Sequence, residues 1–382
     1  MNRISSALLV FALSLGGVFA SCPTHGQAVR VNPDGTGQAL IYPYYTVRNG
    51  WVTLMSVVNH DLARAKALRV RFVEGRNGAT VASFNLFLTP GDVWTGAALP
   101  GATDADPPLL VSNDQSCAGG SVDLTRSPRL QLAFTSSNYR GDTALPAYQS
   151  IDRTREGFIE VIEIGSVSRG TRLFDQIIRR GNYKELPPLC NTVRDADMVL
   201  YGEEPLQPPT GGVAGGGTLM NLAGGMSAEY TAVALDHLWI NSLNTTIRMT
   251  TSIDALPSLA SGDNKVADVH VGGQRRLLTY ATAVDAVSAT LMSNQLAGEY
   301  AYTEDGVIST SWVFTAPTRR YYMRGDATRP FARPWDSASA NACEGAEFDM
   351  SFDREGLGGT YDDFPTRPFI PNEGVCFHAT VL

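Results

Sequence analysis

Residues 38–98, QALIYPYYTVRNGWVTLMSVVNHDLARAKALRVRFVEGRNGATVASFNLFLTPGDVWTGAA, decide the fold of this chain. Runs rich in Val, Ile, Phe and Tyr alternate there with short polar breaks, which is typical of consecutive β-strands. Asn49-Gly50 and Asn77-Gly78 fall between runs, and both residue types tolerate the positive φ of a type I′ hairpin turn. Pro90-Gly91 predicts a further turn. The predicted strands are 38–47, 51–59, 66–75, 80–88 and 92–99.

The third and fourth of these runs alternate between apolar and polar side chains. Leu68, Val70 and Phe72 face one way, while Arg69 and Arg71 face the other. Phe84 and its neighbours at 86 and 88 repeat the pattern in the next run. The sequence therefore predicts a half-buried antiparallel meander that forms one wall of a sandwich, with Phe72 and Phe84 inside it.

Residues 1–20 combine a charged start with an apolar stretch too short for a good membrane span, which is typical of a secretory leader. Gly26-Gln27-Ala28 is a small-x-Ala site, so we predict a signal peptide over 1–28 and a mature chain that begins at Val29. The alternative is a lipobox-like exit that leaves Cys22 as a lipidated N-terminus. Both routes predict export to the periplasm, the outer surface or the medium, and no later run is long enough for a transmembrane span.

The composition favours a loop-rich β protein, with 37 Gly and 21 Pro in 382 residues. A net charge of −8 argues against nucleic acid and anionic membranes as partners. The most marked break is the Pro/Gly-rich stretch 205–217, PLQPPTGGVAGGG, interpreted as a linker or a long loop. We therefore predict an N-terminal β-sandwich domain over 29–204 and a C-terminal β-rich domain over 218–382.

Outside the opening meander the pattern is sparser. Residues 129–134, 157–164, 306–314 and 375–382 alternate like strands, and Gly224-Gly225 predicts a hairpin. Apolar residues at helical spacing predict short helices over 171–180 and 284–296. The expected fold class is all-β, with antiparallel, immunoglobulin-like sandwich units and a few short helices.

Five cysteines are an awkward number for an oxidising compartment, but cleavage after Ala28 removes Cys22 and leaves four. Four cysteines allow three connectivities. The pairs Cys117–Cys190 and Cys343–Cys376 keep each bridge on one side of the Pro/Gly stretch, so we predict this pairing.

Familiar catalytic and cofactor motifs are missing from the sequence. His60, His237, His270 and His378 show no metal-ligand spacing, and no G-x-S-x-G or P-loop occurs. We therefore predict no catalytic residues, no metal and no cofactor. Two alternatives depend on other residues. A secreted hydrolase could use the acidic residues near the C-terminus, and a carbohydrate-binding module could use the early aromatics. The acidic residues are Glu344, Glu347, Asp349, Asp353, Glu355, Asp362 and Asp363, and the aromatics are Tyr42, Tyr44, Tyr45, Trp51 and Trp94.

Four segments carry a resemblance: ALIYPYYTV, FNLFLTPGDVWTG, REGFIEVIEIG and STSWVFTAPTRRYYM. Together they resemble a family of uncharacterised secreted and surface proteins of proteobacteria. The resemblance spans most of the mature chain and implies export, but it implies no activity or ligand. Members of that family tend to continue past the position of Leu382, which implies a longer natural chain.

The prediction for function is a secreted or outer-surface protein, structural or binding rather than catalytic, with a ligand that these patterns do not identify. Turn-rich loops are where binding residues can lie. Self-assembly is a further expectation, because 375–382 ends abruptly within a strand pattern. Either this segment or the arm at 29–31 would offer an unpaired edge to another copy or to another surface component.

Overall fold

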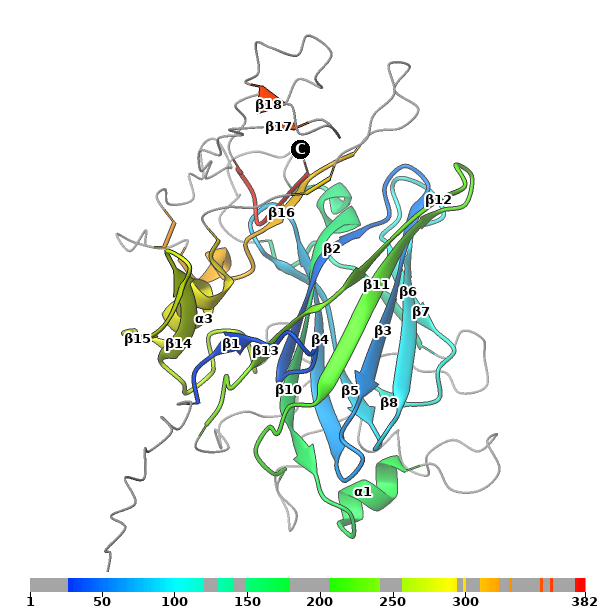
Figure 1. The fold of residues 1–382 in the computed structure, drawn as a ribbon. Coiled ribbons are helices and arrows are strands. Elements are labelled where there is room, and N and C mark those ends of the chain that lie inside the picture. The colour runs from blue at the N-terminus through cyan, green and yellow to red at the C-terminus, as the bar shows by residue number, and fades with distance from the viewer. Residues whose placement is uncertain are drawn as a thin grey trace, which may run out of the picture.

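The computed structural model describes residues 27–119, 130–139, 149–178, 206–240, 256–293, 298–299, 310–322, 330–331, 351–352, 358–359 and 375–381. It is mostly β, with two large antiparallel sheets and several small ones (Figure 1). The seven-stranded sheet has the order β1 (Arg30–Val31), β13 (Val233–Asp236), β2 (Ala39–Thr46), β10 (Glu156–Val167), β4 (Ala65–Glu74), β5 (Thr80–Leu88) and β8 (Cys117–Ala118). The six-stranded sheet has the order β12 (Met226–Thr231), β11 (Val213–Asn221), β3 (Trp51–Asn59), β6 (Val93–Leu99), β7 (Leu109–Ser112) and β9 (Leu130–Ala133).

Smaller elements complete the described part of the chain. The two-stranded sheets are β14 (Val266–Val271) with β15 (Gln274–Thr279), β16 (Val313–Thr315) with β19 (Ala379–Val381), and β17 (Ser351–Phe352) with β18 (Gly358–Gly359). The helices are α1 (Arg172–Ile177) and α3 (Ala283–Leu291), with 3-10 turns η2 (Ile151–Arg155) and η3 (Arg319–Tyr321). In Figure 1, α3 lies beside β14 and β15, and α1 lies at the bottom, next to the end of β10. Among the described residues, no helix is both long and apolar enough to cross a membrane.

One hydrophobic core is shared by the two large sheets. It contains Phe72 from β4 and Phe84 from β5, together with Met55 and Trp94 from the six-stranded sheet. The prediction that Phe72 and Phe84 are buried is confirmed. The alternating apolar residues of each strand supply this core because successive side chains of a strand point to opposite faces.

The predicted strands exist, but the predicted meander is wrong. β2, β4 and β5 lie in the seven-stranded sheet, whereas β3 and β6 lie in the six-stranded sheet. Among consecutive members, the pair β4–β5 is a hairpin. β10 lies between β2 and β4, and β11 pairs with β3. These partners come from far along the chain, and local alternation holds no information about them.

The expectation that the meander is half-buried is also wrong, because every residue of β4 is buried. Arg69 and Arg71 do not belong to the shared core, yet both side chains are buried. Arg71 donates to the backbone oxygen of Pro257 at 2.5 Å and lies 3.5 Å from a carboxylate oxygen of Glu160. Burial, followed by the charge of Arg71, lowers the pKa of Arg69 to about 9.

Of the two predicted type I′ turns, the first has the expected backbone. Asn49 and Gly50 have φ of 51° and 80°, and this turn passes the chain from one sheet to the other. At the second, Gly78 alone has a positive φ. This turn is not of type I′. It is held by the carboxylate of Glu74, which accepts the backbone N–H groups of Arg76, Asn77 and Ala79 at 2.8–3.0 Å.

The stretch 205–217 is described from Leu206 onward, and its glycines belong to a strand. Val213–Gly217 open β11, which pairs with β3 over its whole length. A Cβ atom at Gly215 would lie 2.0 Å from Tyr42 Oη and 2.4 Å from the backbone oxygen of Ser56. One at Gly217 would lie 2.3 Å from the Tyr230 side chain. The glycines therefore make room for two tyrosines, and strands on both sides of this stretch share the two large sheets.

Replacing Gly215 by alanine should lower the free energy of unfolding by about 1–3 kcal/mol, because the methyl group meets a hydroxyl and a backbone carbonyl at once. Urea denaturation measures the loss. Gly119→Ala is the matched control, since its nearest neighbours would lie 3.4 Å or more from the new Cβ. Equal stabilities of the two variants would contradict the packing role of Gly215.

Both predicted helices exist and are shorter than expected. α1 begins after Thr171, whose side chain accepts the N–H of Phe174, and it ends at Ile177. α3 begins after Thr282, which forms a capping box with Asp285. It ends at Leu291, because Met292 is already extended. The predicted strand at 306–314 is described from Thr310, and only Val313 and Phe314 of that range lie in β16.

The two chain ends that were expected to offer unpaired edges are already paired. Arg30 and Val31 pair with β13, and Val29 bridges to Ala267 of β14. β19 pairs with β16, and the N–H of Ala379 also donates to the backbone oxygen of Gly75 at 2.8 Å. Each segment is therefore paired with a neighbouring strand, and strand addition at its outer edge stays a prediction.

Candidate functional site

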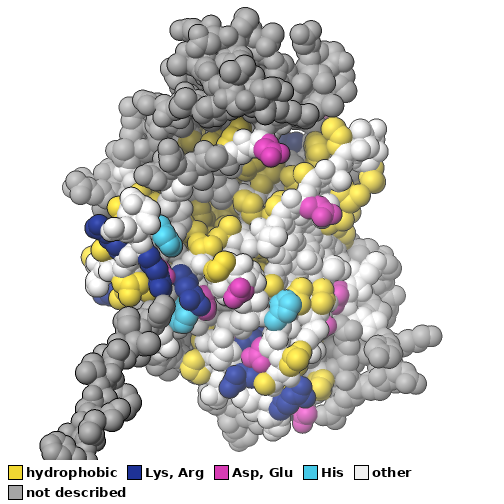
Figure 2. Space-filling view, viewed as in Figure 1, with side chains coloured by type: hydrophobic (Ala, Val, Ile, Leu, Met, Phe, Trp, Pro, Cys, Tyr) yellow, Lys and Arg dark blue, Asp and Glu magenta, His cyan; other side chains and the backbone are white. Residues whose placement is uncertain are grey.

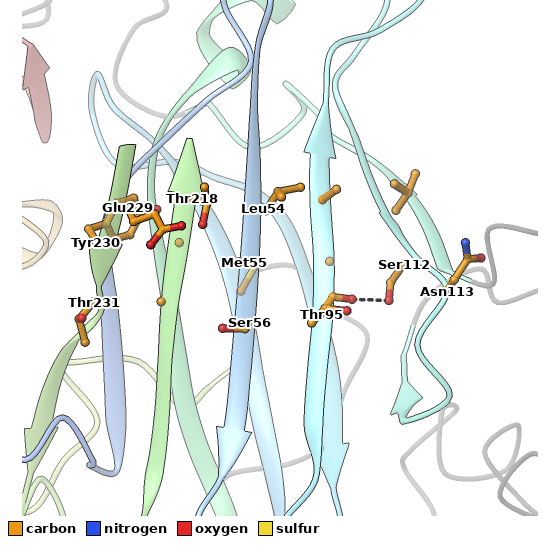
Figure 3. A pocket seen from close by; sticks show the side chains of 15 residues that line it. Leu54, Met55, Ser56, Thr95, Ser112, Asn113, Thr218, Glu229, Tyr230 and Thr231 are labelled. Atoms are coloured by element: carbon orange, nitrogen blue, oxygen red, sulfur yellow. Dashed lines mark hydrogen bonds between the residues drawn. The ribbon is translucent and has the colours of Figure 1, made fainter. Parts of the chain in front are cut away.

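An open concavity of about 710 Å³ lies on the outer face of the six-stranded sheet, away from the shared core. Its floor is built by β12, β11, β3, β6 and β7 (Figure 3). Because strand registers place side chains of adjacent strands directly opposite each other, the lining can be described as rows that cross the strands.

The first row carries hydroxyl groups. Thr231, Gly216, Ser56 and Thr95 lie opposite one another across four strands. Gly216 has no side chain, so it leaves the middle of the row hollow. At the end of the row the hydroxyl of Ser112 donates to the backbone oxygen of Thr95 at 2.5 Å, as Figure 3 shows.

The second row is mostly apolar. Glu229, Thr218, Leu54, Ala97 and Val111 lie opposite one another across five strands. Leu54 is exposed, and Ala97 and Val111 are half-buried, although no described element covers them. The surface therefore presents hydrogen-bonding groups beside apolar groups, without aromatic rings of its own in either row.

Electrostatically the concavity is nearly neutral. Glu229 is the charged residue of its lining. Tyr230 also borders it, but the ring turns toward Gly217, and its hydroxyl donates to the backbone oxygen of Tyr44. Burial raises the pKa of Tyr230. In the view of Figure 2, Lys and Arg side chains gather over β14 and β15 and are sparse over β11 and β12.

The lining holds no pair of groups suited to acid–base or nucleophilic catalysis. A single carboxylate, Glu229, stands among hydroxyls that no histidine or lysine of the lining activates. Within the described ranges, no group of three or more His, Cys, Asp or Glu side chains could hold a metal ion. The hydroxyl and apolar groups of the lining can form hydrogen bonds and van der Waals contacts with a ligand.

The structure also brings together charged residues that the sequence patterns did not single out. Lys66 of β4 and Glu163 of β10 are fully buried, 3.2 Å apart at Nζ and Oε1. Glu163 accepts the N–H groups of Thr210 and Gly211, and Lys66 also lies 3.2 Å from Asp61. Burial raises the pKa of Glu163 against the opposing effect of Lys66.

This cluster fastens the segment before β11 to the seven-stranded sheet, and none of its residues lines the concavity. The sequence pattern indicates this charged cluster only weakly. Lys66 and Glu163 look like the solvent-facing members of alternating strands, but Asp61 and the segment at Thr210 and Gly211 contact them in the folded chain.

His378 is the histidine with the most unusual environment. It is fully buried, and its Nδ1 lies 3.0 Å from the backbone oxygen of Arg76. Burial lowers the pKa of His378 to about 3, and the charges of Arg319, Arg320 and Arg153 act in the same direction. The ring is therefore neutral in the folded protein and packs against Gly78.

This environment predicts an acid-sensitive fold. A depressed folded-state pKa means that the stabilisation is complete above the unfolded value of about 6.5 and is lost as the pH falls toward 3. Because of His378 alone, the free energy of unfolding should be about 2 kcal/mol lower at pH 5 than at pH 7. Urea titrations at both pH values should show that His378→Asn loses less unfolding free energy between pH 7 and pH 5 than the wild type does.

The exposed Leu62 supplies the control, because Leu62→Asn removes no ionisable side chain and should keep the pH dependence of the wild type. If His378→Asn and the wild type lost equal stability between pH 7 and pH 5, the neutral, buried state of His378 would be wrong.

The sequence-predicted candidates do not converge on the concavity. Tyr42, Tyr45 and Trp94 are buried in the shared core, while Tyr44 and Trp51 are half-buried, so these five aromatics form no exposed stacking platform. The carboxylates considered for a hydrolase all lie outside the described residues. They are Glu344, Glu347, Asp349, Asp353, Glu355, Asp362 and Asp363.

Two of the four cysteines in the predicted pairing are described. Cys117 and Cys376 are both disulfide-bonded. Cys190 and Cys343 lie outside the described residues, as does Cys22. The pairing itself therefore stays a prediction.

Comparisons with protein-family models, with curated proteins and with solved structures find no match for this chain. The resemblance to secreted and surface proteins of proteobacteria accordingly stays a prediction that depends on the quoted segments alone.

Proposed function

We propose that this chain is an exported, non-catalytic binding protein whose ligand lies across the outer face of the six-stranded sheet. The observation that carries the proposal is the concavity itself, a hydroxyl row beside an apolar row with one carboxylate and no catalytic pair. The leader-like residues 1–28 support export. The core shared by both large sheets supports a β-sandwich as the scaffold.

The ligand class that fits best is a polypeptide segment. Leu54, Ala97 and Val111 offer shallow apolar contacts, and the adjacent hydroxyls can bond backbone amides. A glycan fits this surface less well, because sugar rings stack on exposed aromatic faces and the ring of Tyr230 is turned inward. A hydrolase acting here is also less well supported, since retaining and inverting mechanisms both need two carboxylates.

The test uses the mature chain and two probe sets, a library of phage-displayed random peptides and a glycan array. We expect selected peptides to bind the wild type and to bind Leu54→Arg at least about tenfold more weakly, because a buried guanidinium disrupts the apolar row. Leu62→Arg is the matched control, since Leu62 is 74% exposed outside the concavity. Glycan binding that is sensitive to Leu54→Arg, turnover of a polysaccharide or protein, or the absence of any peptide ligand would overturn the proposal.

The disulfide pairing Cys117–Cys190 and Cys343–Cys376 is part of this exported form. Cys117 lies opposite Phe87, near the end of β5. Cys376 is two residues before His378, whose N–H donates to the backbone oxygen of Arg76, just before the start of β5 at Thr80. Thr80 and Phe87 are about 23 Å apart along the strand, far beyond the limit of about 7 Å for bonded Cα atoms. Cys117 and Cys376 are therefore not bonded to each other, which leaves two of the three connectivities.

The position of α1 favours the predicted one of the two. Cys117 packs in one cluster with Leu173, Phe174 and Ile177 of α1, and Cys190 follows this helix in the sequence. Peptide mapping of the exported, non-reduced protein should recover peptides that join Cys117 to Cys190, and an N-terminus at Val29. A Cys117–Cys343 peptide would contradict the pairing, and a lipid-modified Cys22 would contradict cleavage after Ala28.

A further inference from the structure

Among the described residues, two strands have an unpaired outer edge, and their charged residues have opposite sign. β12 is the last strand of the six-stranded sheet, and β15 pairs only with β14 among the described residues. Each is six residues long. All residues of β15 are exposed, and so are those of β12 except the half-buried Tyr230. Natural proteins usually protect such edges with Pro, bulges or charges, because unpaired backbone groups invite strand addition.

The backbone groups that point away from each sheet can be assigned from the ladders. The N–H of Ala232 donates to Gly215, so even-numbered residues of β12 bond to β11. Ser227, Glu229 and Thr231 therefore present their N–H and C=O groups to the free edge. On β15 the bond from Tyr280 to Lys265 sets the same alternation.

The outward residues of β15 are accordingly Arg275, Leu277 and Thr279. Both edges thus offer three outward residues at the same two-residue spacing. An antiparallel alignment that pairs Glu229 with Leu277 engages all three on each side and places Arg275 diagonal to Glu229 on one face.

Charge decides which edges can meet. β12 carries one charged residue, Glu229. β15 carries Arg276 and also Arg275, whose guanidinium lies 2.6 Å from a carboxylate oxygen of Asp268 on β14. Pairing β12 with another β12 brings Glu229 near its own copy, and pairing β15 with another β15 brings arginines together. Each edge is therefore protected against itself and complementary to the other.

The apolar side chains agree with this choice. Leu277 is 47% exposed on β15, and Met226 is 46% exposed on β12. Figure 1 places the two strands on different sides of the molecule, with β15 at the left and β12 at the upper right. One copy cannot join its own two edges in this arrangement, so a second copy must supply the partner.

We infer that copies of this chain assemble head to tail, with β15 of one copy adding to the free edge of β12 of the next. Such an interface is heterologous, so it builds open chains rather than a closed twofold dimer. The inference does not depend on the proposed peptide-binding function, although the added strand would extend the sheet beside the concavity.

The first experiment measures assembly of the mature chain by sedimentation velocity over a range of concentrations. We expect association that grows with concentration. Glu229→Arg should weaken it about five- to tenfold, Arg275→Glu should also weaken it, and the double variant should regain part of the loss. Asp34→Arg, on an exposed loop, is the control for net charge.

The second experiment tests direction with two edge-blocked variants. Glu229→Pro and Leu277→Pro each remove an outward N–H and leave the ladder to the neighbouring strand intact. Each variant alone should be monomeric, and an equimolar mixture should form a 1:1 dimer that grows no further. Circular dichroism and the melting temperature check that both variants are folded.

Three results would overturn the inference. The wild type could stay monomeric at every concentration, or one blocked variant could self-associate like the wild type. The mixture of folded variants could also remain monomeric. Leu54 lies on β3, which β11 separates from the free edge of β12, so the peptide selection with Leu54→Arg does not alter that edge. Failure of assembly therefore leaves the proposed function standing, and the reverse also holds.

Discussion

Replacing Phe72 by alanine should lower the free energy of unfolding by about 3–5 kcal/mol, because the ring is fully buried between the sheets. Its centroid lies 5.2 Å from that of Tyr45, edge to face, and 4.9 Å from that of Phe134. Tyr45 and Phe134 complete the triangle at 5.9 Å. Phe134 follows β9 of the six-stranded sheet, so the three rings tie the two sheets together.

Urea denaturation measures the effect, and an unchanged slope identifies it as a loss of stability. Leu62→Ala is the control, because a side chain that is 74% exposed has little to lose. A double-mutant cycle with Phe134→Ala should show a coupling energy of about 0.5–1.5 kcal/mol. A Phe72→Ala variant within 1 kcal/mol of the wild type would show that the rings are not packed as described.

Removing the carboxylate of Glu74 should have a comparable effect, a loss of about 3–5 kcal/mol. Glu74 is fully buried and accepts the N–H groups of Arg76, Asn77 and Ala79. It also lies 2.8 Å from Nη2 of Arg153, which is itself buried. Glu74→Ala therefore strips three backbone donors of their acceptor and leaves a buried guanidinium without its carboxylate.

The exposed pair of Arg48 and Asp152 is the matched control. Its atoms approach to 2.9 Å, but the Asp152 side chain is 55% exposed, so Asp152→Ala should cost no more than about 1 kcal/mol. The double variant Glu74→Ala/Arg153→Met should recover part of the loss, because it removes the uncompensated charge. Equal costs for Glu74→Ala and Asp152→Ala would refute the role of Glu74 as the organiser of the turn.

The candidate site could be predicted only in its parts. Leu54, Thr95 and Thr218 each lie in runs that read as strands, but nothing in one run shows that they meet. Their meeting depends on β11 pairing with β3, whose partners Gly216 and Ser56 are far apart in the sequence. The capping box of Thr282 and Asp285 was readable from its spacing and would have placed the start of α3 correctly.

The sequence by itself determined where strands and helices form, because those preferences are local. A period of two marks β4 and β5, Asn49 and Gly50 mark a turn, and apolar spacing marks α1. What only the tertiary structure decided is which strands pair and which faces are covered. β10 and β11 reach their neighbours from distant parts of the chain, and Arg69 and Arg71 are buried on a face that the alternating pattern predicts to be solvent-exposed.

The glycines of β11 show the same division most clearly. A run of Gly beside Pro reads locally as a flexible linker, since Gly weakens strands and frees the backbone. In the folded chain Gly215 and Gly217 are where Tyr42 and Tyr230 need space, and that need comes from residues on other strands. Local preference is a property of neighbours in the chain, whereas the requirement for a small residue is a property of neighbours in space.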